Sequence, residues 1–392
     1  MILVLNPGSS STKFAVYSNK KEILSGTLEH SGPYSCVLCQ GSEKCLTKEE
    51  ALDPLKMIFS TLKKQKIIVS QKDFAAIGIR VVHGGPTFKK TTRITPEVLK
   101  NLKKISSLAP LHNPPAIKII EKLLRRVPHT PIYASFDTAF HSSIPEYIAN
   151  YALPKAFENN FGIRKYGFHG LSCQSILKQL TILYKKKLPG RIIICHLGSG
   201  SSITAIKNGK SLDTSMGLTP LEGIIMRTRG GDMDPGVVIE LLKHQEENLT
   251  LHEAIEKVEN ILNYESGLKG LTGGISDMRI IIEQANAGND LCQNAIKSYV
   301  YHIQKYIGGY TAALGGCDAI VFTAGTGEAS FYLREKIISG LEALGIVIDT
   351  KKNNANIAPS NIKKEDSTAD IWVLHTDEAQ EIMHEINALD KK

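Results

Sequence analysis

The chain has 392 residues, of which 42% are hydrophobic and 22% are charged, so it has the composition of an ordinary globular protein and enough length for two domains. Its net charge of +8 comes from scattered lysines with no aromatic residues between them, which argues against a nucleic-acid groove. No apolar run reaches membrane-spanning length, and seven scattered cysteines, an odd number, predict a reducing, cytoplasmic location.

The chain begins with an apolar strand, residues 2–5, followed by Asn6-Pro7-Gly8-Ser9-Ser10-Ser11-Thr12-Lys13 and an alternating segment at 14–17. A glycine followed by small hydroxyl residues and a lysine offers close backbone N–H groups, hydroxyl donors and a positive charge, as a polyanion requires. No glycine precedes the lysine, and the next segment alternates like a strand, so a nucleotide P-loop is disfavoured. We predict a phosphate-binding β-hairpin, with an ordinary Gly/Ser turn as the alternative.

The next segments predict short strands over 21–47 and a helix over 51–64. Cys36, Cys39 and Cys45 could form a metal knuckle, but they lack a nearby fourth ligand and Cys36 to Cys39 has the pattern of a strand. A buried strand over 75–83 contains Arg80, which needs an anionic partner there. That partner is either a carboxylate of the core or an anionic substrate at the end of the strand.

A rigid Pro-rich loop at 108–115 leads into a predicted helix from Ala116. The strand at 131–136 then ends in Asp137. Because the carboxyl ends of strands line the ligand crevice of open α/β sheets, Asp137 is a candidate site residue. The chain is expected to cross into its second domain between Ser142 and Tyr151.

The strand–loop–strand pattern returns half a chain later. Residues 191–197 form an apolar strand, Gly198-Ser199-Gly200-Ser201-Ser202 form a loop, and 203–206 form the returning strand. Earlier in the chain, Phe168 and His169 lie between Gly167 and Gly170. A lone His is more often structural, but these glycines let the backbone and the ring approach a ligand. Two such hairpins suggest two related half-molecules that hold the phosphates of one nucleotide between them.

Irregular loops with charged residues follow the second hairpin. Residues 213–223 form a long loop, and Arg227, Arg229, Asp232 and Asp234 cluster behind it. Loops of this length inside a compact domain are usually functional. We therefore expect this region to be functional.

The last third of the chain predicts mostly helices. Thr250 and Glu253 form a capping box for a helix that Gly267 would end, and a long helix spans 290–314. An apolar strand at 319–324 enters Gly325-Thr326-Gly327-Glu328 and a helix, an arrangement that suits a nucleotide.

Near the C-terminus, residues 350–366 are expected to form a surface excursion before a last strand at 371–374. Thr376 is expected to cap a final helix. The apolar face of this helix comprises Ala379, Ile382, Met383 and Ile386, and Glu378 lies in its first turn.

Together these motifs resemble the acetokinase family of the actin, sugar-kinase and heat-shock ATPase superfamily. The resemblance runs along the whole chain and is carried, in order, by Asn6 to Lys13, Arg80 to Gly85, Ala109 to Pro114, Phe136 to His141, Tyr166 to Gly170, His196 to Gly200, Asp213 to Gly223, Thr228 to Pro235 and Phe322 to Glu328. So many ordered matches make an accidental similarity implausible.

The resemblance implies an α/β chain with the two-domain ATPase fold (ribonuclease H-like, actin-like), whose duplicated mixed-sheet domains flank a cleft. The N-terminal domain would comprise residues 1–143 joined by the final helix, 376–392, and the C-terminal nucleotide-binding domain residues 144–375. Family members are homodimers, and the resemblance implies neither a nucleic-acid nor a membrane partner.

The implied reaction is reversible phosphoryl transfer from ATP to acetate, which gives acetyl phosphate and ADP, a step towards acetyl-CoA biosynthesis. Mg²⁺ is the implied cofactor, and Mn²⁺ can substitute. The transfer brings an anion against a polyanion, so positive charge matters more than a strong base. Acetate is already ionised at neutral pH, because carboxyl pKa values lie near ~4.

The family's catalytic residues match Arg80, Asp137, His169 and Arg229. Arg80 and Arg229 would hold the carboxylate of acetate and the transferring phosphoryl group, because their planar forks fit both. His169 and Arg229 would stabilise the transition state, and Asp137 would orient the complex or the metal. The implied oxygen ligands of Mg²⁺ are Asn6 and Glu378.

The remaining implied contacts form two sets. The acetate-binding set comprises Arg80, Val82, Leu111, Phe168 and Pro220. The ATP-binding set comprises Lys13, His196, Leu197, Gly198, Ser199, Gly200, Asp277, Met278, Arg279, Gly325, Thr326, Gly327 and Ala329. The apolar members of the first set would form a small pocket for the methyl group of acetate.

Several positions depart from the family's usual residues. Ser199 replaces Asn, Thr326 replaces Ile and Ala329 replaces Asn, and these changes leave the nucleotide preference open. Ile79, Arg227 and Gly230 replace a common His, Gly and Ser. None of these changes removes a charge on which the reaction depends.

Two other functions are alternatives for this chain. One is a propionate or butyrate kinase of the same family, whose substrate has one or two more methylenes than acetate. An apolar pocket discriminates one methylene by only about 1–3 kcal/mol. An actin-like filament or chaperone ATPase would be indifferent to acetate. Such a protein has no reason to carry Arg80 and Arg229 beside a methyl-sized pocket.

Overall fold

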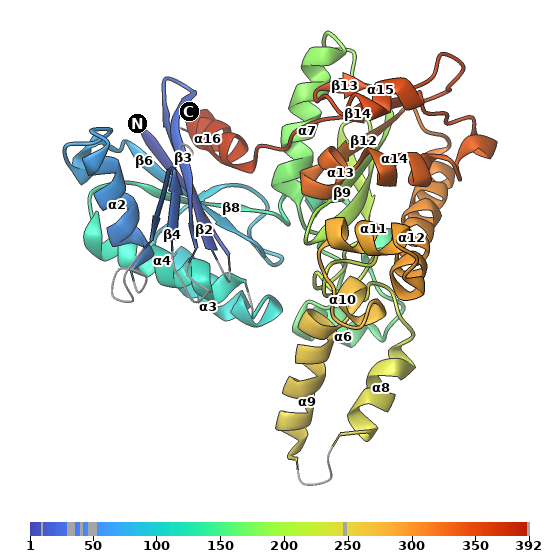
Figure 1. The fold of residues 1–392 in the computed structure, drawn as a ribbon. Coiled ribbons are helices and arrows are strands. Elements are labelled where there is room, and N and C mark those ends of the chain that lie inside the picture. The colour runs from blue at the N-terminus through green and yellow to red at the C-terminus, as the bar shows by residue number, and fades with distance from the viewer. Residues whose placement is uncertain are drawn as a thin grey trace. The chain divides into compact units, whose positions relative to one another are not determined.

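The computed structural model describes residues 1–8, 11–29, 36–39, 42–45, 53–110, 112–245 and 249–389 (Figure 1). The chain divides into two compact units. Unit 1 comprises Met1–Ser142, Gly170–Ser175 and Asp377–Lys392, and unit 2 comprises Ser143–His169 and Ile176–Thr376. The domain division expected from the sequence, 1–143 with 376–392 and 144–375, stays a prediction.

Unit 1 is built on an eight-stranded mixed sheet with the order β5-β4-β3-β2-β1-β6-β8-β7. Its strands are β1 (Ile2–Pro7), β2 (Ser11–Ser18), β3 (Lys21–Glu29), β4 (Cys36–Cys39), β5 (Ser42–Cys45), β6 (Ala76–Val81), β7 (Thr92–Arg93) and β8 (Ile132–Phe136). β1 and β2 pair antiparallel, β6 runs parallel to β1, and β8 runs parallel to β6. The predicted first hairpin is confirmed, although Ser9 and Ser10 lie outside the described residues.

Helices cover both faces of this sheet (Figure 1). They are α2 (Pro54–Lys64), α3 (Pro96–Lys104), α4 (Asn113–Arg126) and α16 (Glu378–Leu389), with 3₁₀ turns at Gln71–Asp73, Ile105–Leu108 and Phe140–Ser143. Side chains of β1 alternate between the faces, as a strand requires. Leu3 and Leu5 pack in the cluster that contains α2 and α4, whereas Ile2 and Val4 pack against α16.

A glycine of β6 lets α16 lie close to the sheet. A Cβ added to Gly78 would lie 2.5 Å from Cγ2 of Ile382 and 2.7 Å from Cδ1 of Ile386. Gly78→Ala is therefore expected to lower the free energy of unfolding by about 1–3 kcal/mol, the usual cost of overpacking a core. Chemical denaturation measures this change. Ala76→Gly in the same strand is a control for glycine content alone, and equal stability of Gly78→Ala and wild type would contradict the packing.

Unit 2 contains a six-stranded sheet with the order β11-β10-β9-β12-β14-β13. Its strands are β9 (Arg191–Leu197), β10 (Ser201–Lys207), β11 (Lys210–Thr214), β12 (Ala319–Thr323), β13 (Ser360–Asn361) and β14 (Asp370–Val373). β9 and β10 pair antiparallel, and β12 runs parallel to β9 and to β14. The predicted second hairpin is confirmed.

The helices of unit 2 include a long one that packs on the sheet. They are α5 (Glu146–Ala149), α6 (Lys155–Phe161), α7 (Gly170–Leu183), α8 (Pro235–Lys243), α9 (Leu251–Asn260), α10 (Gly267–Leu271), α11 (Met278–Asn286), α12 (Asp290–Leu314), α13 (Ala324–Ala329), α14 (Phe331–Ile338) and α15 (Thr350–Asn354), with a 3₁₀ turn at Glu342–Leu344. The first six residues of α7 belong to unit 1. Buried residues of α11, α12 and α14 share one apolar cluster with β9, β10 and β12 (Figure 1).

The two units repeat one sheet plan. The order β3-β2-β1-β6-β8 in unit 1 corresponds to β11-β10-β9-β12-β14 in unit 2. In both units, the first strand of an antiparallel hairpin also pairs with a parallel strand on its other edge. β1 pairs with β2 and β6, and β9 pairs with β10 and β12. The predicted α/β fold with two related mixed-sheet halves is confirmed at this level, which the sequence indicated only through two Gly/Ser turns.

Two helices begin at other residues than the sequence predicted. The helix expected from Ala116 begins at Asn113, because Pro114 and Pro115 fit its first turn, where no N–H is needed. Thr376 does not cap the final helix. That helix begins at Glu378, and Oδ1 of Asp377 accepts a hydrogen bond from N of Gln380 at 2.7 Å.

Two other expectations were wrong. The helix that begins after Thr250 ends at Asn260 and continues as a π-helical turn, Ile261–Glu265, whereas Gly267 begins α10. The stretch 350–366 is more than a surface excursion, because it contains α15 and β13 and buries Asn353 and Ile362.

Within the described ranges, no helix is long and apolar enough to cross a membrane.

Candidate functional site

Charged side chains of unit 1 gather where two parallel strands end. Arg80 lies near the end of β6, and Asp137 directly follows β8. Because β6 and β8 are neighbours, with Arg80 opposite Ser135, their carboxyl ends meet at one edge of the sheet. The fold therefore brings together two residues that lie 57 positions apart in the sequence.

Asp137 holds one side of the Arg80 guanidinium. Nε donates to Oδ1 at 2.9 Å and Nη2 donates to Oδ2 at 2.5 Å, a bidentate pair. Nη1 donates to Oδ1 of Asn6 at 3.2 Å and lies 3.1 Å from Oε2 of Glu378. Burial alone would lower the pKa of Arg80, but Asp137 and Glu378 outweigh it and raise the pKa above its ordinary value. The guanidinium is thus charged and fixed in orientation.

Asn6, Lys13 and Glu378 complete this cluster. Nδ2 of Asn6 donates to Oε2 of Glu378 at 3.2 Å. Lys13 stands opposite Asn6 in the hairpin, so both side chains point to one face. Burial raises the pKa of Glu378 above its ordinary value; Arg80 and Lys13 oppose this rise, and Asp137 adds to it. Two cations, Arg80 and Lys13, therefore face two carboxylates, Asp137 and Glu378, in one cluster.

In unit 2, His169 is held against the second hairpin. Its backbone has φ +59°, a left-handed conformation that is uncommon outside glycine. Its ring stacks on the ring of His196, with centroids 4.0 Å apart and planes inclined by 18°. Nδ1 lies 2.9 Å from Oγ of Ser202. Residues from both strands of the hairpin thus orient this ring.

Arg229 and His169 converge over a glycine of the same hairpin. A Cβ on Gly200 would lie 3.4 Å from Nε2 of His169 and 3.9 Å from Nη1 of Arg229. Burial lowers the pKa of Arg229 from its ordinary value, although a guanidinium stays charged at neutral pH. Two nitrogen groups from different segments therefore lie beside Gly200.

Backbone hydrogen bonds fix the loop that carries Arg229. N of Met226 donates to O of Arg229 at 2.9 Å, and N of Ser266 donates to O of Thr228 at 3.1 Å. A Cβ on Gly267, whose φ is +61°, would lie 2.4 Å from O of Met226, so only glycine lets this close approach occur. The loop is rigidly seated on the start of α10.

The predicted adenosine-binding residues lie at two helix starts of unit 2. Asp277 caps α11 and pairs with Arg279, which lowers the pKa of Asp277 to about 2. Nε of Arg227 donates to Oγ of Ser276 at 3.0 Å, and N of Arg227 donates to O of Ser199 at 3.3 Å. The loop before α11 is thus connected to the phosphate turn through one arginine.

The second helix start is α13, which contains Gly325, Thr326, Gly327 and Ala329. Its first residue, Ala324, has φ +65° and donates its N–H to Oε1 of Glu328 at 2.8 Å. A Cβ on Gly198 would lie 3.6 Å from Cβ of Ala324, so α13 adjoins the phosphate turn. The sequence predicted that Gly325 to Gly327 form a turn before the helix. In the structure they lie inside this short helix.

The predicted site residues therefore form two groups, one in each unit. Unit 1 holds Asn6, Lys13, Arg80, Val82, Asp137 and Glu378, and unit 2 holds Phe168, His169, His196, Leu197, Gly198, Ser199, Gly200, Pro220, Arg229, Asp277, Met278, Arg279, Gly325, Thr326, Gly327 and Ala329. Val82 is half-buried, Phe168 is buried, and Leu111 lies outside the described residues. Convergence of the two groups on one substrate stays a prediction.

Two residues of this region were not singled out from the sequence. Ser202 contacts His169, and Glu328 accepts from Ala324 and pairs with His375. Ser202 belongs to the Gly/Ser loop, but the sequence does not distinguish it from the other serines of that loop. Glu328 was visible only as the end of the Gly-rich segment, because its partners come from other parts of the chain.

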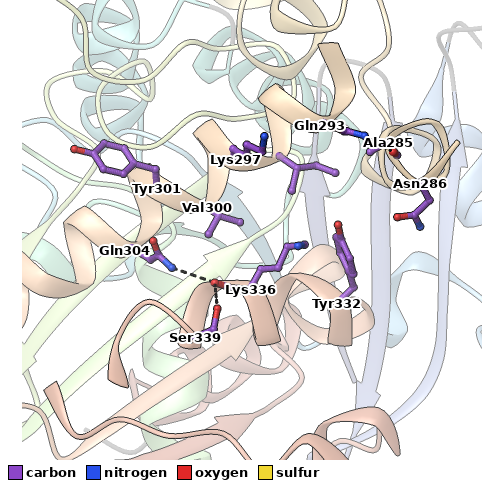
Figure 2. Close-up of a pocket in the computed structure, with 11 residues that line it drawn as sticks. Ala285, Asn286, Gln293, Lys297, Val300, Tyr301, Gln304, Tyr332, Lys336 and Ser339 are labelled. Atoms are coloured by element: carbon purple, nitrogen blue, oxygen red, sulfur yellow. Dashed lines mark hydrogen bonds between the residues drawn. The ribbon is translucent and has the colours of Figure 1, made fainter. Parts of the chain in front are cut away.

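A separate hollow of about 470 Å³ lies among α11, α12 and α14 (Figure 2). Its lining includes Lys297, Tyr332 and Lys336, with the ammonium of Lys336 4.8 Å from the centre of the Tyr332 ring. Gln304 joins α12 to α14 by donating to O of Lys336 at 3.0 Å. None of the residues that line it is a predicted site residue, so it is not the substrate site expected from the sequence.

Comparison with known proteins decides the family. Residues 1–384 match the model of the Acetokinase family. The chain belongs to the acetokinase family. It is therefore an enzyme of the transferase class, a kinase, as the motifs from Asn6 to Glu328 predicted. The actin-like filament and chaperone ATPase alternatives do not apply.

Relatives of this family match the chain over nearly its full length. An acetate kinase of Sulfurovum sp. is 40% identical over 99% of this chain and 98% of its own. Among solved structures, a propionate kinase from Francisella tularensis has a TM-score of 0.90 and 36% identity, covering 98% of each chain. An acetate kinase from Porphyromonas gingivalis has a TM-score of 0.88 and 37% identity, covering 99% of each chain.

Proposed function

We propose that this acetokinase-family enzyme transfers the γ-phosphoryl group of ATP to acetate and back, interconverting acetate and ATP with acetyl phosphate and ADP. The observation that carries the proposal is the Arg80 cluster. Asp137 takes the Nε–Nη2 side of the guanidinium, so the orientation of its Nη1 end is fixed. Nη1 contacts Asn6 and Glu378, so a carboxylate or phosphoryl oxygen would take the second N–H of Nη2 or replace one of these two contacts.

The reaction needs charge and not a base. Acetate is ionised at neutral pH, since carboxyl pKa values lie near ~4, so no proton has to be removed before its oxygen attacks phosphorus. The attacking carboxylate and the phosphoryl group are both anionic, and their approach requires fixed positive charge. Arg80 is proposed to hold the carboxylate, and Arg229 the oxygens of the phosphoryl group in flight.

The other predicted residues divide between the phosphates and the nucleoside. His169 is proposed to donate from Nε2 to the transferring phosphoryl group beside Nη1 of Arg229. The backbone of Gly198 to Gly200 and the ammonium of Lys13 are proposed to bind the other phosphates. Asp277 to Arg279 and Gly325 to Ala329 are proposed to enclose the adenosine. Asp137 is proposed to orient Arg80, a narrower role than the sequence suggested.

The oxygen atoms near Arg80 fit a divalent cation. Oδ1 of Asn6 and Oε2 of Glu378 both contact Nη1 of Arg80, at 3.2 Å and 3.1 Å, so the two oxygens lie near a common point. Mg²⁺ is usually bound through one or two protein oxygens together with water and phosphate, so a dedicated cage is not required. In the part of the chain that is described, no three His, Cys, Asp or Glu residues form such a cage. When bound, Mg²⁺ (or Mn²⁺) would neutralise phosphate charge.

A propionate kinase is the second candidate, favoured by the similarity to the Francisella tularensis structure. Val82 is proposed to line the methyl pocket together with Leu111, Phe168 and Pro220. Its size is therefore expected to decide between acetate and propionate as substrate. Val82→Ala is expected to raise kcat/KM for propionate relative to acetate by roughly 10-fold, since one methylene in an apolar pocket is worth about 1–3 kcal/mol. Steady-state kinetics with both acids measures the ratio. An unchanged ratio would mean that Val82 does not line the pocket.

The proposed reaction is tested by trapping acyl phosphate with hydroxylamine in the presence of ATP and formate, acetate, propionate or butyrate. Acetate is expected to give the highest kcat/KM. A higher value for propionate would assign the enzyme to the second candidate. A homodimer and a cytoplasmic location are further proposals, which rest on the family resemblance.

A further inference from the structure

The side chain of Ser202 has one hydrogen-bond partner in the described chain, the imidazole of His169. Ser202 lies on β10 opposite His196 on β9, so the two side chains share the face on which the His169 ring rests. The residue is completely buried, and its Oγ lies 2.9 Å from Nδ1 of His169. The contact therefore matters to the protonation of both groups.

The direction of this hydrogen bond decides which imidazole nitrogen carries the proton. If the hydroxyl donates, Nδ1 must be the acceptor and the proton of neutral His169 lies on Nε2. If Nδ1–H donates, the buried hydroxyl proton of Ser202 is left with no acceptor among the described residues, which costs free energy. Satisfaction of Ser202 therefore favours the Nε2–H tautomer.

The surroundings of the ring favour the same state. Nε2 lies beside Gly200, and Nη1 of Arg229 lies beside the same glycine. The positive charge of that guanidinium disfavours a second positive charge on the imidazole. The stacked ring of His196 restricts rotation of the imidazole, so exchange of the two nitrogens is hindered. The guanidinium of Arg229 and the imidazole of His196 are thus two titratable groups beside His169.

We propose that Ser202 is a positioning residue that holds His169 as the neutral Nε2–H tautomer, with the N–H directed at the phosphoryl site. The role of the Nε2–H group as a donor to the phosphoryl group rests on the proposed function. The tautomer of His169 can be measured without any reaction. Ser202 would then act on catalysis through His169 and not by touching substrate.

The experiment compares Ser202→Ala, Ser202→Thr and a matched control, Thr204→Val. Thr204 is also buried on β10, two residues further on the same face, and its hydroxyl bonds to Thr214 instead of to His169. Thr204→Val therefore removes a buried hydroxyl from this strand without altering His169. The ¹⁵N resonances of histidine-labelled protein, with His169→Asn to assign the signal, report the tautomer at pH 8.

Wild type and Thr204→Val are expected to show His169 protonated at Nε2, and Ser202→Ala a mixture of both tautomers. In the kinase assay Ser202→Ala is expected to lower kcat about 10-fold with the KM for ATP within twofold, and Ser202→Thr to restore most of it. An Nδ1–H tautomer in wild type, or unchanged tautomer and kcat in Ser202→Ala, would overturn the proposal. If wild type forms no acyl phosphate, the proposed function fails while the ¹⁵N result still decides the tautomer.

Discussion

Arg229→Ala is expected to lower kcat for acyl phosphate formation by about 10³-fold or more while the protein stays folded. A guanidinium that stabilises the transition state of phosphoryl transfer is worth about 10³–10⁵ in kcat. Burial is the main influence on the pKa of Arg229, so its charge is held at a cost in desolvation. The fold is expected to persist, because backbone hydrogen bonds hold the loop that carries Arg229. Steady-state kinetics and thermal unfolding measure the two effects.

Arg229→Lys is the matched control for this variant. Lysine keeps the positive charge but lacks the planar fork, so partial recovery is expected relative to alanine. A kcat near that of wild type in Arg229→Ala would remove Arg229 from the proposed charge clamp. A large loss of stability with proportionate loss of activity would assign it a structural role instead.

Arg80→Ala is expected to reduce both activity and stability. The side chain of Asp137 is 1% exposed and is paired with Arg80, so the variant leaves a buried carboxylate without its partner. Breaking one side of such a pair costs about 3–5 kcal/mol, and activity should fall by orders of magnitude because the acetate clamp is lost. Denaturant unfolding and kcat/KM for acetate give the two numbers.

The double variant Arg80→Ala/Asp137→Ala separates these effects. Without the buried carboxylate, it should be more stable than Arg80→Ala alone, yet its activity should remain as low. Recovery of activity together with stability would show that Arg80 serves the fold and not the reaction. That outcome would leave the proposed carboxylate clamp without its main residue.

Local pattern was sufficient for much of the fold. The two Gly/Ser turns between apolar strands indicated the hairpins β1–β2 and β9–β10, and the apolar face at Ile382, Met383 and Ile386 indicated how α16 packs. Both depend on residues adjacent in sequence or one helical turn apart. The duplicated sheet followed because each hairpin leads a set of parallel strands.

Features that depend on distant partners could not be predicted from the sequence. Asp137 was a candidate because it ends a strand, but its pairing with Arg80 requires that β6 and β8 be neighbours. Ser202 was one of several serines in a loop until its contact with His169 appeared. Asp377 caps α16 in place of the predicted Thr376. The backbone N–H of Thr376 donates instead to Glu328, a partner that is distant in the sequence.

In the proposed reaction, acetate supplies the attacking oxygen and ATP supplies the phosphoryl group. Incubation of the enzyme with ATP, Mg²⁺ and [¹⁸O]acetate, followed by ³¹P NMR, tests it. An acetyl phosphate signal shifted by one ¹⁸O bonded to phosphorus is expected, with ADP formed in equal amount. Inorganic phosphate released at the same rate with and without acetate, and no labelled acyl phosphate, would contradict it.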